Sequence, residues 1–97
     1  MVDHVPHRLE EEVARGNDAR RILEHPLWQE AFDTYEARLL AGWSSSGVHD
    51  VDAREKIWLA LQTVKIIKHD LESIMTTGKM ATLQMERSEN GRKASKH

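Results

Sequence analysis

The chain has 97 residues, no cysteine and a formal net charge of −2 at pH 7. This length allows one domain, and the lack of cysteine excludes a disulfide framework, a thiolate zinc site and a thiol nucleophile. The first residues lack the apolar stretch of a signal peptide, and no apolar run approaches the roughly 20 residues that span a bilayer. We therefore expect a protein that is not secreted and has no membrane partner.

Acidic and basic residues are distributed unevenly along the chain. Residues 1–51 carry ten acids and five bases, whereas residues 52–97 carry six acids and nine bases. Opposite charges on successive segments favour pairing within a chain or between chains. Two ordinary solvated surfaces would give the same counts, so the charge pattern does not by itself decide between these alternatives.

The N-terminal quarter of the chain predicts little stable structure. Residues 1–16 are polar and acidic, and we expect them to form a flexible arm. Asp18 is a good N-cap for a short helix at about 18–24. His25 precedes Pro26, and the residue before a proline avoids the α region, so the helix should break there. Proline suits the first turn of the helix that follows.

The next segment, about 26–43, has the spacing of a helix that packs along one side. Its large apolar residues recur at alternating intervals of four and three, which is typical of a packing seam between helices. They are Trp28, Phe32, Tyr35 and Leu39. The small and flexible residues at 44–47 then predict a loop.

The strongest periodicity in the chain predicts a second long helix at about 52–77. Its apolar residues alternate at intervals of three and four. They are Ile57, Ala60, Val64, Ile67, Leu71 and Ile74. Gly78 could end this helix as a left-handed cap, although the apolar Met80 leaves open that the helix continues. Residues 87–97 are small, polar and basic, so we expect a disordered tail.

Two such segments joined by a short loop predict an all-α fold, with an antiparallel two-helix hairpin as its main element. The hairpin domain would cover residues 17–86, between the acidic arm and the basic tail. Its predicted core consists of Trp28, Phe32, Tyr35, Leu39, Ile57, Val64, Ile67, Leu71 and Ile74.

The hairpin seam leaves several large apolar side chains unused. These are Trp43, Trp58, Leu59 and Ile66, which fall beside or opposite the seam. Contiguous exposed apolar residues mark interaction sites, and tryptophan is a frequent anchor of protein interfaces. We predict a protein partner here, either a second copy of the chain or a larger protein. The alternative is that the short helix at about 18–24 folds back over some of these residues.

No residue pattern predicts catalysis, a cofactor or a metal site. His69 and Glu72 are one turn apart and could supply two ligands, whereas a catalytic zinc typically takes three from the protein. The serines at 44–46 have no neighbouring base and no nucleophile-elbow context, and no glycine-rich phosphate loop is present. We therefore expect a protein that is not an enzyme and that holds no cofactor.

Basic side chains near the C-terminus could contact the phosphates of a nucleic acid, which would add salt-dependent affinity without sequence preference. They are Arg87, Arg92, Lys93 and Lys96. The chain as a whole is slightly acidic, however, and lacks the basic surface expected of a nucleic-acid-binding domain. Nucleic acid is therefore the weaker partner prediction.

Two stretches of the sequence resemble small helical proteins encoded by tailed bacteriophages and prophages. They are residues 19–43 (ARRILEHPLWQEAFDTYEARLLAGW) and 52–81 (DAREKIWLALQTVKIIKHDLESIMTTGKMA). The shared pattern is a short helix, a proline-containing break, a helix with EAF and LL..W, and a helix that begins REK.WLAL and ends near GK. The resemblance covers about residues 19–85 and departs from the pattern directly after His69. It implies a role in head or packaging assembly and supplies no catalytic residues.

Three functions remain open from the sequence. The first is a non-enzymatic phage structural or assembly protein, in the host cytoplasm or the virion, that acts by helix-mediated self-association or by docking on a larger component. The second is a DNA-packaging subunit similar to a small terminase. The third is a phage-encoded inhibitor that binds a host protein through its acidic first half.

Overall fold

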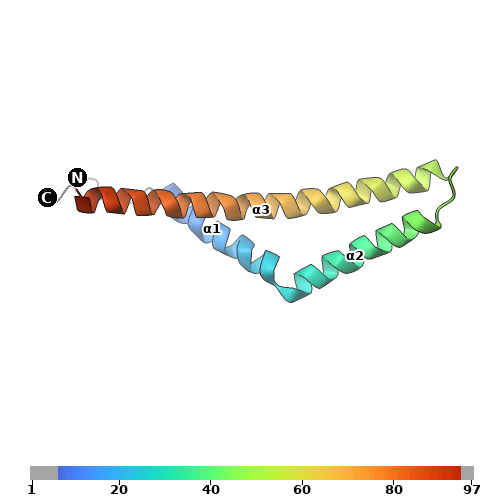
Figure 1. Cartoon of the computed structure of the whole chain (residues 1–97), viewed down its shortest axis with the longest axis horizontal. Helices are drawn as coiled ribbons and strands as arrows, with labels where there is room; N and C mark the ends of the chain where they lie inside the picture. The colour runs from blue at the N-terminus through green and yellow to red at the C-terminus, as the bar shows by residue number, and fades with distance from the viewer. Residues whose placement is uncertain (1–6, 95–97) are drawn as a thin grey trace. The chain divides into compact units, whose positions relative to one another are not determined.

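The computed structural model describes residues 7–94, with side chains described as far as Gly91. These residues form three α-helices, α1 (His7–Glu24), α2 (Pro26–Ser45) and α3 (Val51–Ala94), and no strand (Figure 1). The expected all-α class is confirmed. The chain divides into two compact units. Unit 1 contains the described residues before Ile22 and after Asp70, and unit 2 is Ile22–Asp70.

Helix α1 is longer than the short helix expected at about 18–24. The prediction of a flexible arm is wrong for residues 7–16, which are helical, and residues 1–6 lie outside the described part. Charged pairs one turn apart, such as Arg8 Nε at 3.3 Å from Glu12 Oε1, support the exposed side of this helix. Its buried side contains Leu9, 1% exposed.

In unit 1, α1 and α3 approach each other at a pair of buried glycines. A Cβ atom on Gly16 would lie 2.8 Å from the Cα atom of Gly78, and one on Gly78 would lie 2.9 Å from the carbonyl oxygen of Glu12. Residues without a Cβ atom allow the two backbones to come this close. Ala19 and Ala81, at 3% and 2% exposed, continue the contact with further small side chains.

Helix α3 continues well beyond the expected end at residue 77. Gly78 lies inside the helix and no described glycine has a positive φ, so of the two alternatives left open by the sequence the helix continues and Gly78 is not a left-handed cap. The seam spacing of three and four continues through Gly78, Ala81 and Met85, which explains why the helix does not stop. The tail predicted to be disordered is helical over residues 87–94, and residues 95–97 lie outside the described part.

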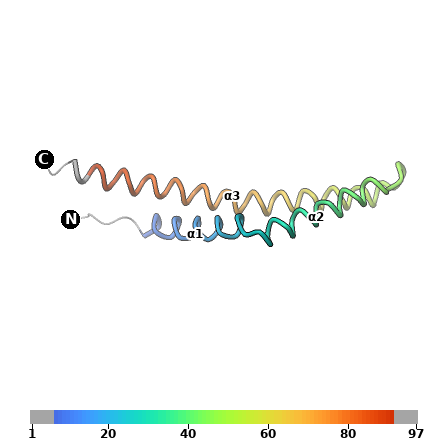
Figure 2. Tube along the Cα trace, turned by 60° about the horizontal axis from the view of Figure 1, so that its bottom comes forward, coloured from blue at the N-terminus to red at the C-terminus, as the bar shows by residue number. Residues whose placement is uncertain are grey.

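The break between α1 and α2 falls at His25, as predicted. His25 has an extended backbone, with φ −70° and ψ 126°, and its Nδ1 atom accepts a hydrogen bond from the Leu27 N–H at 3.1 Å. Pro26 occupies the first turn of α2, where a missing N–H costs no helical hydrogen bond. Helix α2 ends at Ser45, two residues beyond the expected boundary, and a turn over residues 46–50 leads to α3 (Figure 2).

In unit 2, side chains of α2 and α3 meet at two levels. Lys68 Nζ lies 2.9 Å from Glu36 Oε1 and 5.5 Å from the ring centroid of Phe32. The Phe32 ring in turn lies 4.3 Å from that of Trp28. Nearer the turn, Arg54 lies over the ring of Trp43. These contacts cover one side of α3 in this unit.

The predicted hairpin core is buried only in part. Val64 is 4% exposed, and most of the other predicted core residues are half-buried. These are Trp28, Phe32, Leu39, Ile57, Leu71 and Ile74. Tyr35 and Ile67 are 45% and 42% exposed, so their assignment to the core is wrong, because two helices shield only a narrow seam between them. Ile74 belongs to unit 1, where it lines a recess with side chains of α1.

The glycine contact in unit 1 predicts opposite effects for two Gly→Ala substitutions in the same helix. Gly78→Ala should lower the free energy of unfolding by about 1–3 kcal/mol, because its methyl group would meet backbone atoms that cannot rotate away. Gly91→Ala meets nothing within 4 Å and should be neutral or stabilising by up to about 1 kcal/mol through helix propensity. Urea unfolding followed by circular dichroism measures both, and equal stabilisation by the two variants would contradict the close contact.

Candidate interaction surface

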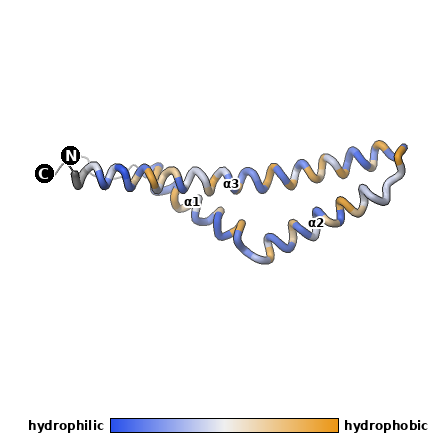
Figure 3. Tube along the Cα trace, in the orientation of Figure 1, coloured by the Kyte–Doolittle hydropathy of each residue, from blue (hydrophilic) through white to orange (hydrophobic). Residues whose placement is uncertain are grey.

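The apolar residues of α3 in unit 2 fall on two opposite sides of the helix. An α-helix turns by about 100° per residue, which places Val51, Trp58, Leu59 and Ile66 in one sector and the buried Val64 on the other side. The four residues of the first sector are 65%, 54%, 52% and 59% exposed, respectively. We call this sector the outer face of α3. The hydropathy colouring of Figure 3 shows hydrophobic residues recurring along α3 from the turn onward, with a mostly hydrophilic stretch towards its C-terminal end.

The inner side of α3 in unit 2 is closed by α2. Val64 is buried, and Ile57 touches the open side of Gly42, where an added Cβ would lie 3.4 Å from Ile57 Cδ1. The Lys68–Glu36 ion pair lies farther along this side, with each side chain about one-third exposed. Because α2 occupies the inner side, it cannot also cover the outer face.

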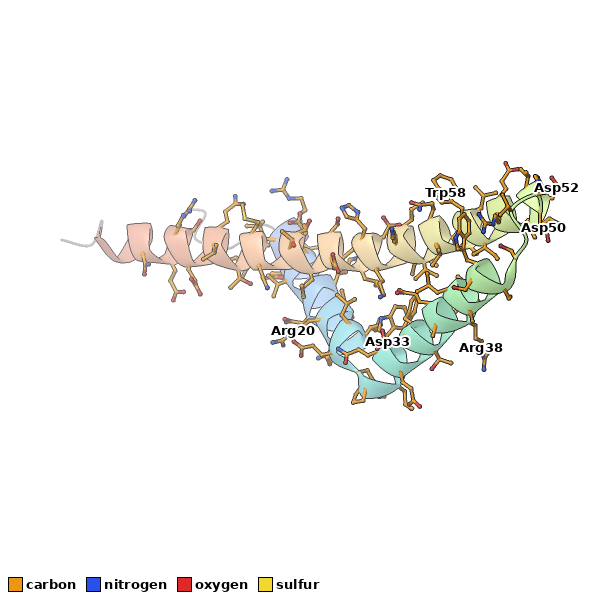
Figure 4. The ribbon with its side chains drawn as sticks, turned by 45° about the vertical axis from the view of Figure 1, so that its right-hand side comes forward. Arg20, Asp33, Arg38, Asp50, Asp52 and Trp58 are labelled. Atoms are coloured by element: carbon orange, nitrogen blue, oxygen red, sulfur yellow. The ribbon has the colours of Figure 1, made fainter. Side chains whose placement is uncertain are left out.

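A shallow recess of about 310 Å³ opens at the start of the outer face, next to the turn. It is lined by Trp43, Val51, Arg54, Glu55 and Trp58. The Arg54 guanidinium lies 4.7 Å from the Trp43 ring centroid, and its Nε donates a hydrogen bond to Ser46 Oγ at 2.8 Å. These two contacts hold Arg54 and Trp43 in place without help from any other molecule. Figure 4 labels Trp58 on α3, close to the turn.

Two polar residues, Glu55 and Gln62, lie within the outer face, and Glu55 has no ion pair among the described residues. Glu55 lies between Val51 and Trp58 and is exposed, and the half-buried Gln62 lies between Leu59 and Ile66. Their positions, one turn from the exposed apolar residues, make the surface amphipathic. It can offer a partner apolar contact area together with one carboxylate and one amide.

Two further observations describe the polar side chains of the described residues. None of their polar or charged side chains is buried, and no group of three or more His, Cys, Asp or Glu residues among them could hold a metal ion. None of the described helices has the length and apolar character needed to cross a membrane.

The residues predicted as a partner interface are all at the surface of unit 2. Trp58, Leu59 and Ile66 lie on the outer face, and Trp43 is 36% exposed at the wall of the recess. Their role in binding stays a prediction. Sequence reasoning missed Val51, because the predicted helix began at about residue 52. The signal was present, since Val51 lies two helical turns before Trp58.

The residues predicted to contact nucleic acid lie at the far end of α3. Arg87 is exposed in this helix. Arg92 and Lys93 belong to the helix by their backbone, with side chains outside the described part, and Lys96 lies outside the described residues. Comparison with protein-family models, curated proteins and solved structures finds no match to this chain.

The two sides of α3 should respond differently to truncation. Val64→Ala should lower the free energy of unfolding by about 1–2 kcal/mol, because it removes two buried methyl groups. Ile66→Ser should change it by no more than about 0.5 kcal/mol, because Ile66 is 59% exposed and serine has a similar helix propensity. Thermal unfolding at submicromolar concentration measures both, and a larger loss for Ile66→Ser would show that the outer face is covered within one chain.

Proposed function

We propose that this chain is a non-enzymatic structural or assembly protein that acts by helix-to-helix association, with copies of itself or with a larger component. The outer face of α3 carries this proposal. Four large apolar side chains there are more than half exposed, and the inner side of the same helix is already occupied by α2. An exposed apolar surface of this kind, bordered by polar residues, is characteristic of an interaction site.

The proposal includes an antiparallel hairpin of α2 and the first part of α3. Two contacts support it. Near the turn, Arg54 lies over Trp43, and farther from the turn Lys68 pairs with Glu36. Residue numbers fall on one helix as they rise on the other, as they do in an antiparallel pair. Such a hairpin leaves the outer face of α3 in unit 2 available to a partner.

A place in a bacteriophage particle or its packaging machinery rests on the resemblance of residues 19–85 to small helical phage proteins. The chain would then act in the host cytoplasm or the virion. A subunit of about this size can complete its small core by oligomerisation or docking, because it buries little apolar surface alone. The proposed activity is therefore binding, with the outer face as the contact.

The test replaces the apolar side chains of the outer face with serine. Trp58→Ser/Leu59→Ser/Ile66→Ser should remove concentration-dependent association in light scattering, while circular dichroism still shows a helical protein. Leu27→Ser/Leu40→Ser is the matched control, because these residues of α2 are 67% and 55% exposed and lie off the outer face.

The proposal is contradicted if both of the following results are obtained. One is a wild-type chain that stays monomeric at every concentration. The other is its absence from purified particles and from complexes with other phage proteins, as determined by mass spectrometry. Equal loss of association in the control variant would instead show that general surface hydrophobicity drives the association.

A further inference from the structure

The outer face has a symmetric arrangement of residue types about its middle. Along the sequence, Val51 and Ile66 are equally far from the midpoint between Trp58 and Leu59. Glu55 and Gln62 are also equally far from this midpoint, and they lie closer to it than Val51 and Ile66 do. Val51, Trp58, Leu59 and Ile66 supply the apolar positions. Between them, Glu55 supplies a hydrogen-bond acceptor and Gln62 an amide donor. A surface with this symmetry is complementary to a copy of itself turned by 180°.

We infer that a second copy of this chain covers the outer face, with the two α3 helices antiparallel and a two-fold axis between Trp58 and Leu59. This inference rests on the proposed function and names its partner. The contact is isologous: the same residues of both copies take part, and each contact occurs twice. The segment from Val51 to Ile66 gives about four helical turns of contact.

The register places apolar residues against apolar residues. Val51 comes to the level of Ile66 of the second copy, and Trp58 to the level of Leu59 of the second copy. Side chains at alternating offsets of this kind interdigitate when two helices pack. All four are more than half exposed in the single chain, so each gains cover in the dimer. Burial of this area supplies the driving force.

Glu55 and Gln62 favour the antiparallel orientation of the two α3 helices over the parallel one. At the level of Glu55 lies Gln62 of the second copy, whose amide can donate a hydrogen bond to the carboxylate. A parallel pair in register would instead bring Glu55 against Glu55 and desolvate two like charges. A polar residue inside a helix seam commonly sets register and orientation in this way.

The recess beside the turn fits the same register. Lys65 is one turn beyond Gln62 and comes to the region of the recess on the second copy, which is lined by Trp43, Val51, Arg54, Glu55 and Trp58. Its methylene chain can lie on the Trp58 ring, since Arg54 already occupies the Trp43 ring, while its ammonium group approaches the carboxylate of Glu55. Lys65 is exposed and has no ion pair among the described residues of the single chain. The recess therefore has room for Lys65, while the reciprocal pairing of Glu55 with Gln62 is what favours a second copy over an unrelated partner.

Two substitutions of one residue test the orientation. Gln62→Lys should tighten the dimer and Gln62→Glu should weaken it, each by roughly tenfold in the dissociation constant, because each changes two symmetry-related contacts with Glu55. The effects of the two substitutions on the stability of the single helix should be opposite to their effects on dimer affinity. Within one chain, Gln62→Glu places a carboxylate one turn from Lys65, which is favourable, whereas Gln62→Lys places two like charges there. Sedimentation velocity over a concentration series measures the constants.

The controls are Gln84→Lys and Gln84→Glu, which change the net charge equally at an exposed glutamine of α3 outside the contact. Both should leave the dissociation constant within about twofold of the wild-type value. Weakening by Gln62→Lys would overturn the antiparallel register, because a parallel pair would bring two lysines together. Equal shifts from Gln62 and Gln84 variants would overturn the contact itself.

Cysteine cross-linking gives a second measurement, because the chain has no cysteine of its own. Glu55→Cys/Gln62→Cys should form covalent dimers rapidly on mild oxidation. Glu55→Cys alone should not, because in this register its two copies are about 10 Å apart along the helix axis. Efficient cross-linking of the single variant would overturn the inference.

The failure of this inference differs from the failure of the proposed function. If the wild type forms an oligomer whose dissociation constant does not change on substitution of Gln62, the antiparallel contact is overturned. The proposed function then still holds through self-association by another surface. A monomeric wild type that binds a larger phage protein through Trp58 and Ile66 also overturns the inference, but it supports the proposed function.

Discussion

In unit 2, helix α3 carries apolar side chains on two opposite sides, and α2 covers only one of them. Val64 on the inner side is 4% exposed, whereas Ile66, two residues later, is 59% exposed. A single helix packed against another helix buries only a stripe along the contact. The proposal that this chain acts by association follows from this constraint, because the second stripe needs a cover that unit 2 does not provide.

The parts of the fold that sequence predicted are those with large apolar residues at helical spacing. The pattern from Ile57 to Ile74 indicated a long packing helix, and the His25–Pro26 pair indicated the break before α2. The sequence failed where packing uses small residues. Gly16 ends the segment that was expected to be flexible and Gly78 was a candidate cap, but in unit 1 they form a close backbone contact between α1 and α3. Hydropathy cannot distinguish a glycine that ends a helix from one that lets two helices touch.

The surface positions of the apolar residues were predicted more fully than the core, whereas their role in binding stays a prediction. Trp43, Trp58, Leu59 and Ile66 were identified because they do not fit the seam, and all four are at the surface. Tyr35 and Ile67 fit the seam spacing and are nevertheless exposed. Periodicity states which residues share a side of a helix, whereas the width of the buried stripe depends on how closely the second helix packs. Val51 was missed because a helix end gives no periodic context on one side.

The most direct test of the uncovered outer face is hydroxyl-radical labelling of the wild-type chain at increasing concentration, read out by mass spectrometry. At high dilution Trp58, Leu59 and Ile66 should be labelled strongly and Val64 weakly. As the concentration rises, the first three should become protected while the exposed Tyr35 on α2 keeps its labelling rate. If Trp58, Leu59 and Ile66 are already protected at the lowest concentration, the single chain covers its own outer face and the account is contradicted.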